Sequence, residues 1–507
     1  MAEERMGDRS EASTLLLMAA TFVSRLLGIL KSRLIALVFG SGTLSDAMNF
    51  SYNLSNNFRK LFAEGSLSAS YIPLFASCED DGRTARLYRQ VASFLILIFA
   101  LIITAVAIFA RPIMAALSDF EGEGLEVAAF LLPPFTLFLF FISLATLSAS
   151  ILQTKRRFLA SGIAPIFFTL TMLLSLWLLS DDVGYWSMAI GAVAGSLAQL
   201  AIVLIDFRKL GIRFRLDFHF AANEDFRTLM RSWLPASASS LVAIASQSVT
   251  MYLASRLEAG SVTALSNAIV FYSAPYGIVF ASVNAVYFPL ISRRKDERGR
   301  AAALSDALVN LTTFLLPAAL VLASLSRECV ASLLQGGAFT LDDTVLTASV
   351  LTAYLAAMLP MAFYAMLQRW MYSTLDYWRN LAVGVAVSLA DIAFTLFYMS
   401  QGLGVVSMPL ASLSSSLIGT LCLFPFVHGF DWRRFIHKGG RVIIANIPLA
   451  ATVVLYGKWN PQFYTAGSTL RTLVLTIIAG LGMLAVALAS YIAFKVDFLS
   501  ALRNRRP

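Results

Sequence analysis

The chain has 507 residues, of which 58% are hydrophobic and only 14% charged, with a formal net charge of +9 and a mean hydropathy of +0.73. A soluble chain of this length would need charged domain surfaces, so the composition excludes an ordinary soluble protein. Repeated apolar runs, each long enough to cross about 30 Å of hydrocarbon, instead predict an all-α polytopic membrane protein.

The N-terminal stretch MAEERMGDRSEAS is polar, and the apolar run after it is too long for a signal-peptide core, so we expect no removable leader. Cysteine is scarce and scattered, with no CxxC pair, which excludes a disulfide framework and gives no basis for a thiolate metal site. The three histidines fall near predicted membrane edges, and we interpret them as interfacial or loop residues.

Hydropathy predicts fourteen transmembrane helices. In chain order they lie near 15–39, 47–75, 88–110, 127–152, 159–180, 185–205, 232–255, 264–291, 303–325, 346–368, 380–400, 404–427, 442–457 and 470–494.

The distribution of basic residues supports this count. Of the 39 Lys and Arg residues, 29 fall in alternate connections and both termini, five fall on the opposite side, and five fall inside the first two spans. Because cytoplasmic loops carry an excess of Lys and Arg, both termini are predicted to be cytoplasmic. The basic pI therefore reflects topology, and we expect no nucleic-acid partner.

A short internal repeat suggests two lobes. SASYIPLFAS at 68–77 and NAVYFPLISR at 284–293 each end a span before a basic loop. We therefore expect two parallel six-helix lobes and two further helices, with a substrate cavity between the lobes. The expected boundaries are 1–205 for the N-terminal lobe, 206–231 for a cytoplasmic or interfacial linker, 232–428 for the C-terminal lobe, and 429–507 for the last two helices and the tail.

Charges inside the first two spans are the sharpest functional signal, because charge within a membrane is costly and usually functional. The five basic residues there are Arg25, Lys31, Arg33, Arg59 and Lys60. Helical spacing places a series of polar residues of the second span on one face, formed by Asn49, Asn53, Asn57, Lys60, Glu64 and Ser68.

Two hypotheses explain these charges. They can pair with one another and fix helix packing, as Lys60 and Glu64 could at i, i+4. Asp46 and Glu64 are, however, the only acids against five bases, which favours a site that receives an anion. Arginine forks suit phosphate or pyrophosphate through bidentate hydrogen bonds.

Residues 22–76 resemble the start of the MurJ (MviN) lipid II flippase family, within the MOP exporter superfamily. The resemblance rests on a Ser-Arg-x-x-Gly in the first span, an Asp opening the second, and a basic Phe-Ala-Glu-Gly run before a Pro. In this chain these are Ser24, Arg25, Gly28, Asp46, Arg59, Lys60, Phe62, Ala63, Glu64, Gly65 and Pro73.

The resemblance implies a MOP flippase fold of fourteen helices and a polyprenyl-pyrophosphate-linked disaccharide peptide as cargo, moved to the outer leaflet by alternating access. It implies substrate binding by Arg25, Lys31 and Arg59, with Asp46 and Glu64 matching family acids. Lys60, Asn49 and Asn53 complete the predicted substrate-binding set from the polar face of the second span. Lys31 replaces the usual arginine, which keeps the charge and loses the fork.

The eighth span departs from the family pattern. Many members carry an acidic residue and an arginine where this chain has Ile269 and Val270, and a further acid where it has Ser273. Either the N-lobe bases suffice, or the cargo is another lipid-linked oligosaccharide.

Asp391 is the one carboxylate deep in a C-lobe span. It could hydrogen-bond Ser388 or a nearby backbone group, or it could hold a coupling cation, Na⁺ or H⁺; the membrane potential is another possible drive. No other cofactor and no metal are expected.

The strictly alternating stretch GIRFRLDFHF at 211–220 is typical of an extended or interfacial segment.

Competing functions fit less well. An enzyme acting on the same lipid carrier would need convergent carboxylates or a metal site, and the sequence offers no Asp-x-Asp and no His cluster. A MATE-like drug exporter would favour acidic cavity residues for cationic drugs, and a scaffold would not need five bases in two spans. We expect a monomeric multi-pass transporter of the bacterial cytoplasmic membrane, in contact with membrane lipids.

Overall fold

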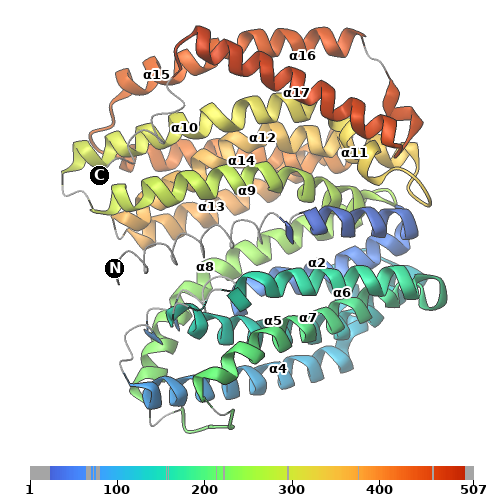
Figure 1. The fold of residues 1–507 in the computed structure, drawn as a ribbon, viewed down its shortest axis with the longest axis vertical. Coiled ribbons are helices and arrows are strands. Elements are labelled where there is room, and N and C mark those ends of the chain that lie inside the picture. The colour runs from blue at the N-terminus through green and yellow to red at the C-terminus, as the bar shows by residue number, and fades with distance from the viewer. Residues whose placement is uncertain are drawn as a thin grey trace, which may run out of the picture. The chain divides into compact units, whose positions relative to one another are not determined.

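The computed structural model describes residues 23–24, 26–63, 70–71, 74–75, 80–155, 157, 159–212, 214–220, 223–293, 296–374, 376–459 and 462–496. Within these ranges the chain is almost entirely helical, and its single β-bridge joins Gly336 and Phe339 (Figure 1). The chain divides into two compact units, Met1–Thr263 and Ala264–Pro507. This confirms the predicted all-α fold class.

The first unit is built around a central apolar helix, α5, which packs against α2, α4 and α7. α6 packs on α7, and α8 contacts both α2 and α4. The elements are a helix over residues 26–39, α2 (Thr43–Phe62), α4 (Asp81–Leu117), α5 (Gly122–Thr154), α6 (Leu159–Val183), α7 (Trp186–Phe207), the 3₁₀ turn η1 (Arg208–Leu210) and α8 (Glu224–Ser255).

Aromatic and small residues fix the core of this unit. Phe135 and Phe138 of α5 are fully buried against Met48 of α2. On α7, a Cβ added at Gly195 would lie 2.6 Å from the carbonyl oxygen of Phe168 on α6. Small residues allow such close approach of helices within a membrane, where packing and not water drives association.

In the second unit α12 is the central helix, in contact with α10 and α14, while α13 packs on α14 and α16 on α17. The elements are α9 (Ser261–Arg293), α10 (Glu297–Ser324), α11 (Ser326–Leu334), α12 (Leu341–Ser373), α13 (Tyr377–Ser400), η3 (Gly404–Val406), α14 (Ser407–Leu423), η4 (Phe424–Phe426), α15 (Trp432–Ala445), α16 (Ile447–Trp459), η5 (Phe463–Ala466) and α17 (Leu470–Ala493). The first three residues of α9 belong to the first unit.

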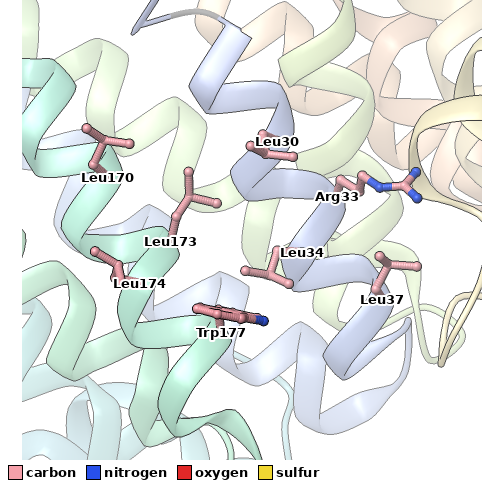
Figure 2. A pocket seen from close by; sticks show the side chains of 8 residues that line it. All are labelled: Leu30, Arg33, Leu34, Leu37, Leu170, Leu173, Leu174 and Trp177. Carbon is pink, nitrogen blue, oxygen red and sulfur yellow. The ribbon is translucent and has the colours of Figure 1, made fainter.

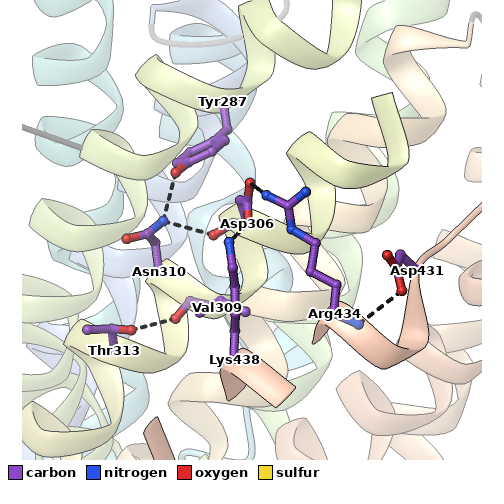
Figure 3. A network of polar contacts seen from close by, with 8 residues as sticks. All are labelled: Tyr287, Asp306, Val309, Asn310, Thr313, Asp431, Arg434 and Lys438. Atoms are coloured by element: carbon purple, nitrogen blue, oxygen red, sulfur yellow. Dashed lines mark hydrogen bonds and ion pairs between the residues drawn. The ribbon is translucent and has the colours of Figure 1, made fainter. Parts of the chain in front are cut away.

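A polar network ties the basic helix α15 to α10 (Figure 3). Asp306 of α10 accepts from Arg434 and Lys438 of α15, both at 2.8 Å. One turn further along α10, Asn310 donates to the Tyr287 hydroxyl at 2.7 Å. Because Asp306 pairs with both Arg434 and Lys438, these two cations of α15 serve to pack it against α10.

Each of the fourteen predicted spans overlaps helical residues within the part of the chain that the structure describes. Eleven of the described helical segments are long and apolar enough to cross a membrane. The other three are the first helix, of which only part is described, and α2 and α8, whose polar residues lower their hydropathy. The chain is therefore a multi-pass membrane protein, and its predicted lobe boundaries at 206 and 232 stay predictions.

Candidate functional site

The second span presents two polar faces. Ser51 of α2 donates to the carbonyl oxygen of Ala128 at 2.6 Å and so joins α2 to α5. Asn49 and Asn53 lie on a different face, because each is two residues, and therefore about 200° of helix rotation, from Ser51, whereas the two asparagines are only about 40° apart. Of these two, Asn49 is buried and Asn53 half-buried.

Lys31 is held over an aromatic ring. Its Nζ lies 5.1 Å from the ring centroid of Tyr52 on α2. Tyr52 in turn stacks on Phe138 of α5 with centroids 5.8 Å apart and meets Phe135 edge-on. The cation is half-buried, and a cation–π contact of this kind stabilises a charge that has lost part of its water.

Arg59 lies in the last turn of α2, seven residues and therefore two turns after Tyr52, on the same face of the helix. Its side chain is half-buried. Lys31 and Arg59 thus flank one side of α2. A cation in the last turn of a helix is also favoured by the helix dipole, so packing contributes to its placement whatever it binds.

Three predicted site residues fall outside what the structure describes. Arg25 and Glu64 lie outside the described residues, as does the side chain of Lys60. The predicted Lys60–Glu64 pair and the role of Arg25 therefore stay predictions.

Asp46 and Asn49 contact the start of α9. The carboxylate of Asp46 accepts from the backbone N–H groups of Gly260 at 2.8 Å and Thr263 at 2.7 Å. Asn49 donates to the Thr263 hydroxyl at 3.1 Å. Since the first N–H groups of a helix have no partner within it, Asp46 supplies the acceptor they need. The structure shows this capping role, and the role of Asp46 and Asn49 in substrate binding stays a prediction.

An apolar cavity of about 300 Å³ lies between the first helix and α6. Figure 2 shows leucines from both helices lining it together with Trp177, while the guanidinium group of Arg33 extends away from the leucines of α6. Arg33 is the one charged residue of this lining, and the other lining residues are apolar, so the cavity is poorly suited to a pyrophosphate and none of the predicted substrate-binding residues lines it.

Asp391 of α13 accepts a hydrogen bond from Ser415 of α14, with Oγ and Oδ1 2.8 Å apart. The partner is thus a neighbouring helix and not Ser388, which the sequence suggested. Among the described residues no cluster of three or more His, Cys, Asp or Glu side chains could hold a metal ion. The coupling-cation role of Asp391 stays a prediction.

Where the family pattern has charges, α9 carries an aromatic series. Tyr272 stacks on Tyr354 of α12 with centroids 5.1 Å apart, and Tyr276 stacks on Phe280 at 5.6 Å. Ser273 donates to the carbonyl oxygen of Val270 at 3.1 Å, a bond within its own helix. The sequence analysis missed this series, although the four-residue spacing of its aromatics was the available signal.

Comparison with known proteins settles the family. A sequence model described as "Lipid II flippase MurJ" matches residues 35–490. The chain belongs to the MurJ family. Among curated members, the probable lipid II flippase MurJ of Borreliella burgdorferi is 27% identical, covering 96% of this chain and 97% of that protein. The one of Rhizobium meliloti is 29% identical, covering 96% and 94%.

Solved structures share the fold. A lipid II flippase MurJ in an inward closed conformation aligns with a TM-score of 0.79 and 24% identity, covering 96% of this chain and all of that one. An inward-facing MATE multidrug transporter of the MOP superfamily aligns with a TM-score of 0.62 and 11% identity over 84% of this chain. The MurJ family resemblance, the MOP fold and the choice of a transporter over an enzyme are confirmed.

Proposed function

We propose that this protein moves lipid II from the cytoplasmic to the outer leaflet by alternating access. The observation that carries the proposal is the family match across residues 35–490, which takes in most of the predicted spans. It acts in the bacterial inner membrane as a monomer with both termini cytoplasmic, driven by a coupling cation or the membrane potential.

In this proposal the cations of the first two spans hold the pyrophosphate. Lys31 and Arg59 flank one side of α2, and Arg25 joins them from the first span. Arg59 supplies a bidentate fork and Lys31 a point charge set by the ring of Tyr52. Glu64 pairs with Lys60 and keeps the empty patch from binding anions too tightly to release them.

A second candidate cargo is another lipid-linked oligosaccharide. It is favoured by Ile269, Val270 and Ser273, which give the second unit no charge where many members have one, and by the aromatic series beside them. Aromatic faces pack against apolar faces of other molecules without requiring charge.

The decisive experiment replaces the chromosomal flippase of a depleted bacterium with this chain and its variants. Arg59→Ala should abolish growth at normal expression, because a charge-assisted hydrogen bond contributes roughly 1.5–3 kcal/mol and its loss weakens binding about tenfold or more. The Arg59→Lys chain should support growth of the depleted bacterium only partly, because lysine lacks the guanidinium fork. The Lys31→Arg chain should support growth fully, because arginine restores a fork beside the Tyr52 ring.

The matched control is Arg379→Ala, which removes an exposed arginine that already pairs with Asp376. It should grow like the unaltered chain. Growth of the Arg25→Ala and Arg59→Ala strains with normal membrane insertion would refute the pyrophosphate clamp. Growth failure of the unaltered chain, with transport of a peptide-free lipid-linked glycan in vesicles, would favour the second cargo.

A further inference from the structure

The segment between α7 and α8 is extended and anchored on α4. After the left-handed Gly211, residues 214–219 run without helix. The backbone N–H of Asp217 donates to Ser93 Oγ at 2.8 Å, and Gln90 donates to the carbonyl oxygen of His219 at 3.2 Å. These contacts hold the segment beside the N-terminal part of α4, just before the long apolar run of that helix.

Alternate side chains of this segment differ sharply in character. Phe214, Leu216 and Phe218 are each more than half exposed, at 53%, 56% and 52%. Successive residues of an extended chain point to opposite sides, so the intervening positions, including Arg215 and Asp217, face the other way. Three large apolar side chains exposed together on a basic loop are typical of a segment lying at a membrane surface.

The segment borders a hollow of about 520 Å³, open to the outside, which is lined by its polar residues and by Leu216. Its lining is Arg89, Arg215, Leu216, Asp217 and His219. Asp217 is already engaged: it accepts from the backbone N–H and the ring of His219, both at 3.0 Å, and from Gln90 at 3.3 Å.

The two arginines of the hollow have no carboxylate partner among the described residues. Arg89 is half-buried, and its Nε is fully buried without a hydrogen-bond partner. Two guanidinium groups against one carboxylate leave the hollow positive even with a neutral His219. Arginines without a carboxylate partner beside an open hollow are suited to a phosphate, which accepts their planar N–H pairs.

We propose that the hollow binds the phosphate of an anionic phospholipid headgroup of the cytoplasmic leaflet, while Phe214, Leu216 and Phe218 enter the headgroup region of the same leaflet. The lipid is preferred to a soluble anion because Arg215 and the exposed apolar side chains occur on one ten-residue segment, with Arg89 of α4 lining the same hollow. Anionic lipids of that leaflet attract basic segments next to transmembrane helices. This site is separate from the cations of the first two spans and does not depend on the cargo.

The test measures binding of short-chain phosphatidylglycerol to the full-length protein in micelles of a neutral detergent. Phosphatidylcholine and inorganic phosphate serve as comparison ligands, and hydrogen exchange of residues 211–220 reports the site. Phosphatidylglycerol should slow exchange in this segment, phosphatidylcholine should do so less, and inorganic phosphate should not compete at equal phosphate concentration.

Arg215→Gln should weaken phosphatidylglycerol binding about tenfold. The matched control is Lys209→Gln, which removes one positive charge from the same linker although its ammonium already pairs with Asp206 at 3.1 Å. It should change the affinity less than twofold. Phe214→Ser combined with Phe218→Ser should weaken binding equally at low and high salt, since apolar contacts are not screened.

Equal affinity for phosphatidylglycerol and phosphatidylcholine would overturn the proposal, as would equal effects of Arg215→Gln and Lys209→Gln. Effective competition by inorganic phosphate would replace it by a site for a soluble anion. Arg89→Gln is a further variant of the same site, provided that the protein still folds. Arg215 and Lys209 are both exposed, so the comparison of their variants tests the proposal even if Arg89→Gln does not fold.

Discussion

The hydrogen bond between Asp391 and Ser415 separates two hypotheses for this carboxylate. A packing role requires only the hydrogen bond from Ser415, which an asparagine at position 391 could still accept through its side-chain oxygen. Binding of a coupling cation requires the negative charge of the aspartate. Asp391→Asn should therefore lower transport and remove any sodium or proton dependence while leaving the protein folded. Transport into vesicles, measured with and without each gradient, gives the result.

Ser415→Ala is the complementary variant, because it removes the bond and keeps the charge. Thermal stability should fall in Ser415→Ala and ion dependence should persist. If Asp391→Asn retains the ion dependence of the unaltered chain, Asp391 has a packing role only.

Part of this residue-level picture was readable from the sequence. The unusual density of bases in the first two spans is a composition signal, and so is the lone carboxylate in α13. The partners were not readable. Asp46 bonds residues more than 200 positions away, and Asp391 bonds a serine of the next helix, because tertiary packing and not local spacing chooses such partners.

At the scale of elements, the contact between α6 and α7 depends on a missing side chain. In Gly195→Ala the new methyl group would lie 2.6 Å from a backbone carbonyl of α6, so the helices must separate. The variant should lose several degrees in its thermal midpoint in detergent, although alanine alone favours helix by about 1 kcal/mol over glycine.

Gly482→Ala in α17 is the matched control, because an added Cβ there meets nothing within 4 Å. It should keep or slightly raise the midpoint. An unchanged midpoint in Gly195→Ala would mean that α6 and α7 can shift at little cost.

The start of α8 is joined to the start of α4 by a bidentate pair. Arg83 Nε donates to Asp225 Oδ2 at 2.7 Å, and a second guanidinium nitrogen donates to Oδ1. These hydrogen bonds hold the pKa of Asp225 below its usual range. A depressed pKa in the folded state means that the stabilisation is complete above the unfolded pKa of about 3.9 and is lost as pH falls through the lower folded value.

Asp225→Asn should consequently reduce the free energy of unfolding near neutral pH by up to about 1 kcal/mol, the range for exposed pairs. The difference from the unaltered chain should vanish as the pH falls through the lowered pKa of Asp225 in the folded protein. Thermal melts across this pH range measure it. Glu224→Gln, a change at an exposed neighbour in the same first turn, is the control for losing one negative charge at the start of α8.

Elements were predicted better than their ends. Hydropathy located every long helix because about 20 apolar residues are needed to span the bilayer. It missed α11, a nine-residue helix too short to give that signal, and it placed the end of α4 at 110 although the helix continues to Leu117. The extended segment at 211–220 was found because strict alternation is a local pattern.

At the scale of the whole molecule, the alternation of basic loops predicts the orientation of every helix at once. Basic residues lie where α9 ends and α10 begins, at 293–300, and in the first turns of α4, at 83–89, whereas the connection after α13 at Ser400 has none. Moving any one loop to the other face would require the whole series to shift by one span. The orientation is therefore either correct throughout or wrong throughout, which makes two positions a sufficient test.

Ser292→Cys, near the end of α9, should react with a membrane-impermeant maleimide only after the membrane is opened, because the positive-inside rule predicts that this end of α9 is cytoplasmic. Ser400→Cys, at the end of α13, should react in intact cells. Both serines are exposed, and both variants need a cysteine-free background, since Cys422 is also exposed. Labelling of Ser292→Cys from outside, with no labelling of Ser400→Cys, would invert the molecule in the membrane and with it the leaflet that the linker at 211–220 faces.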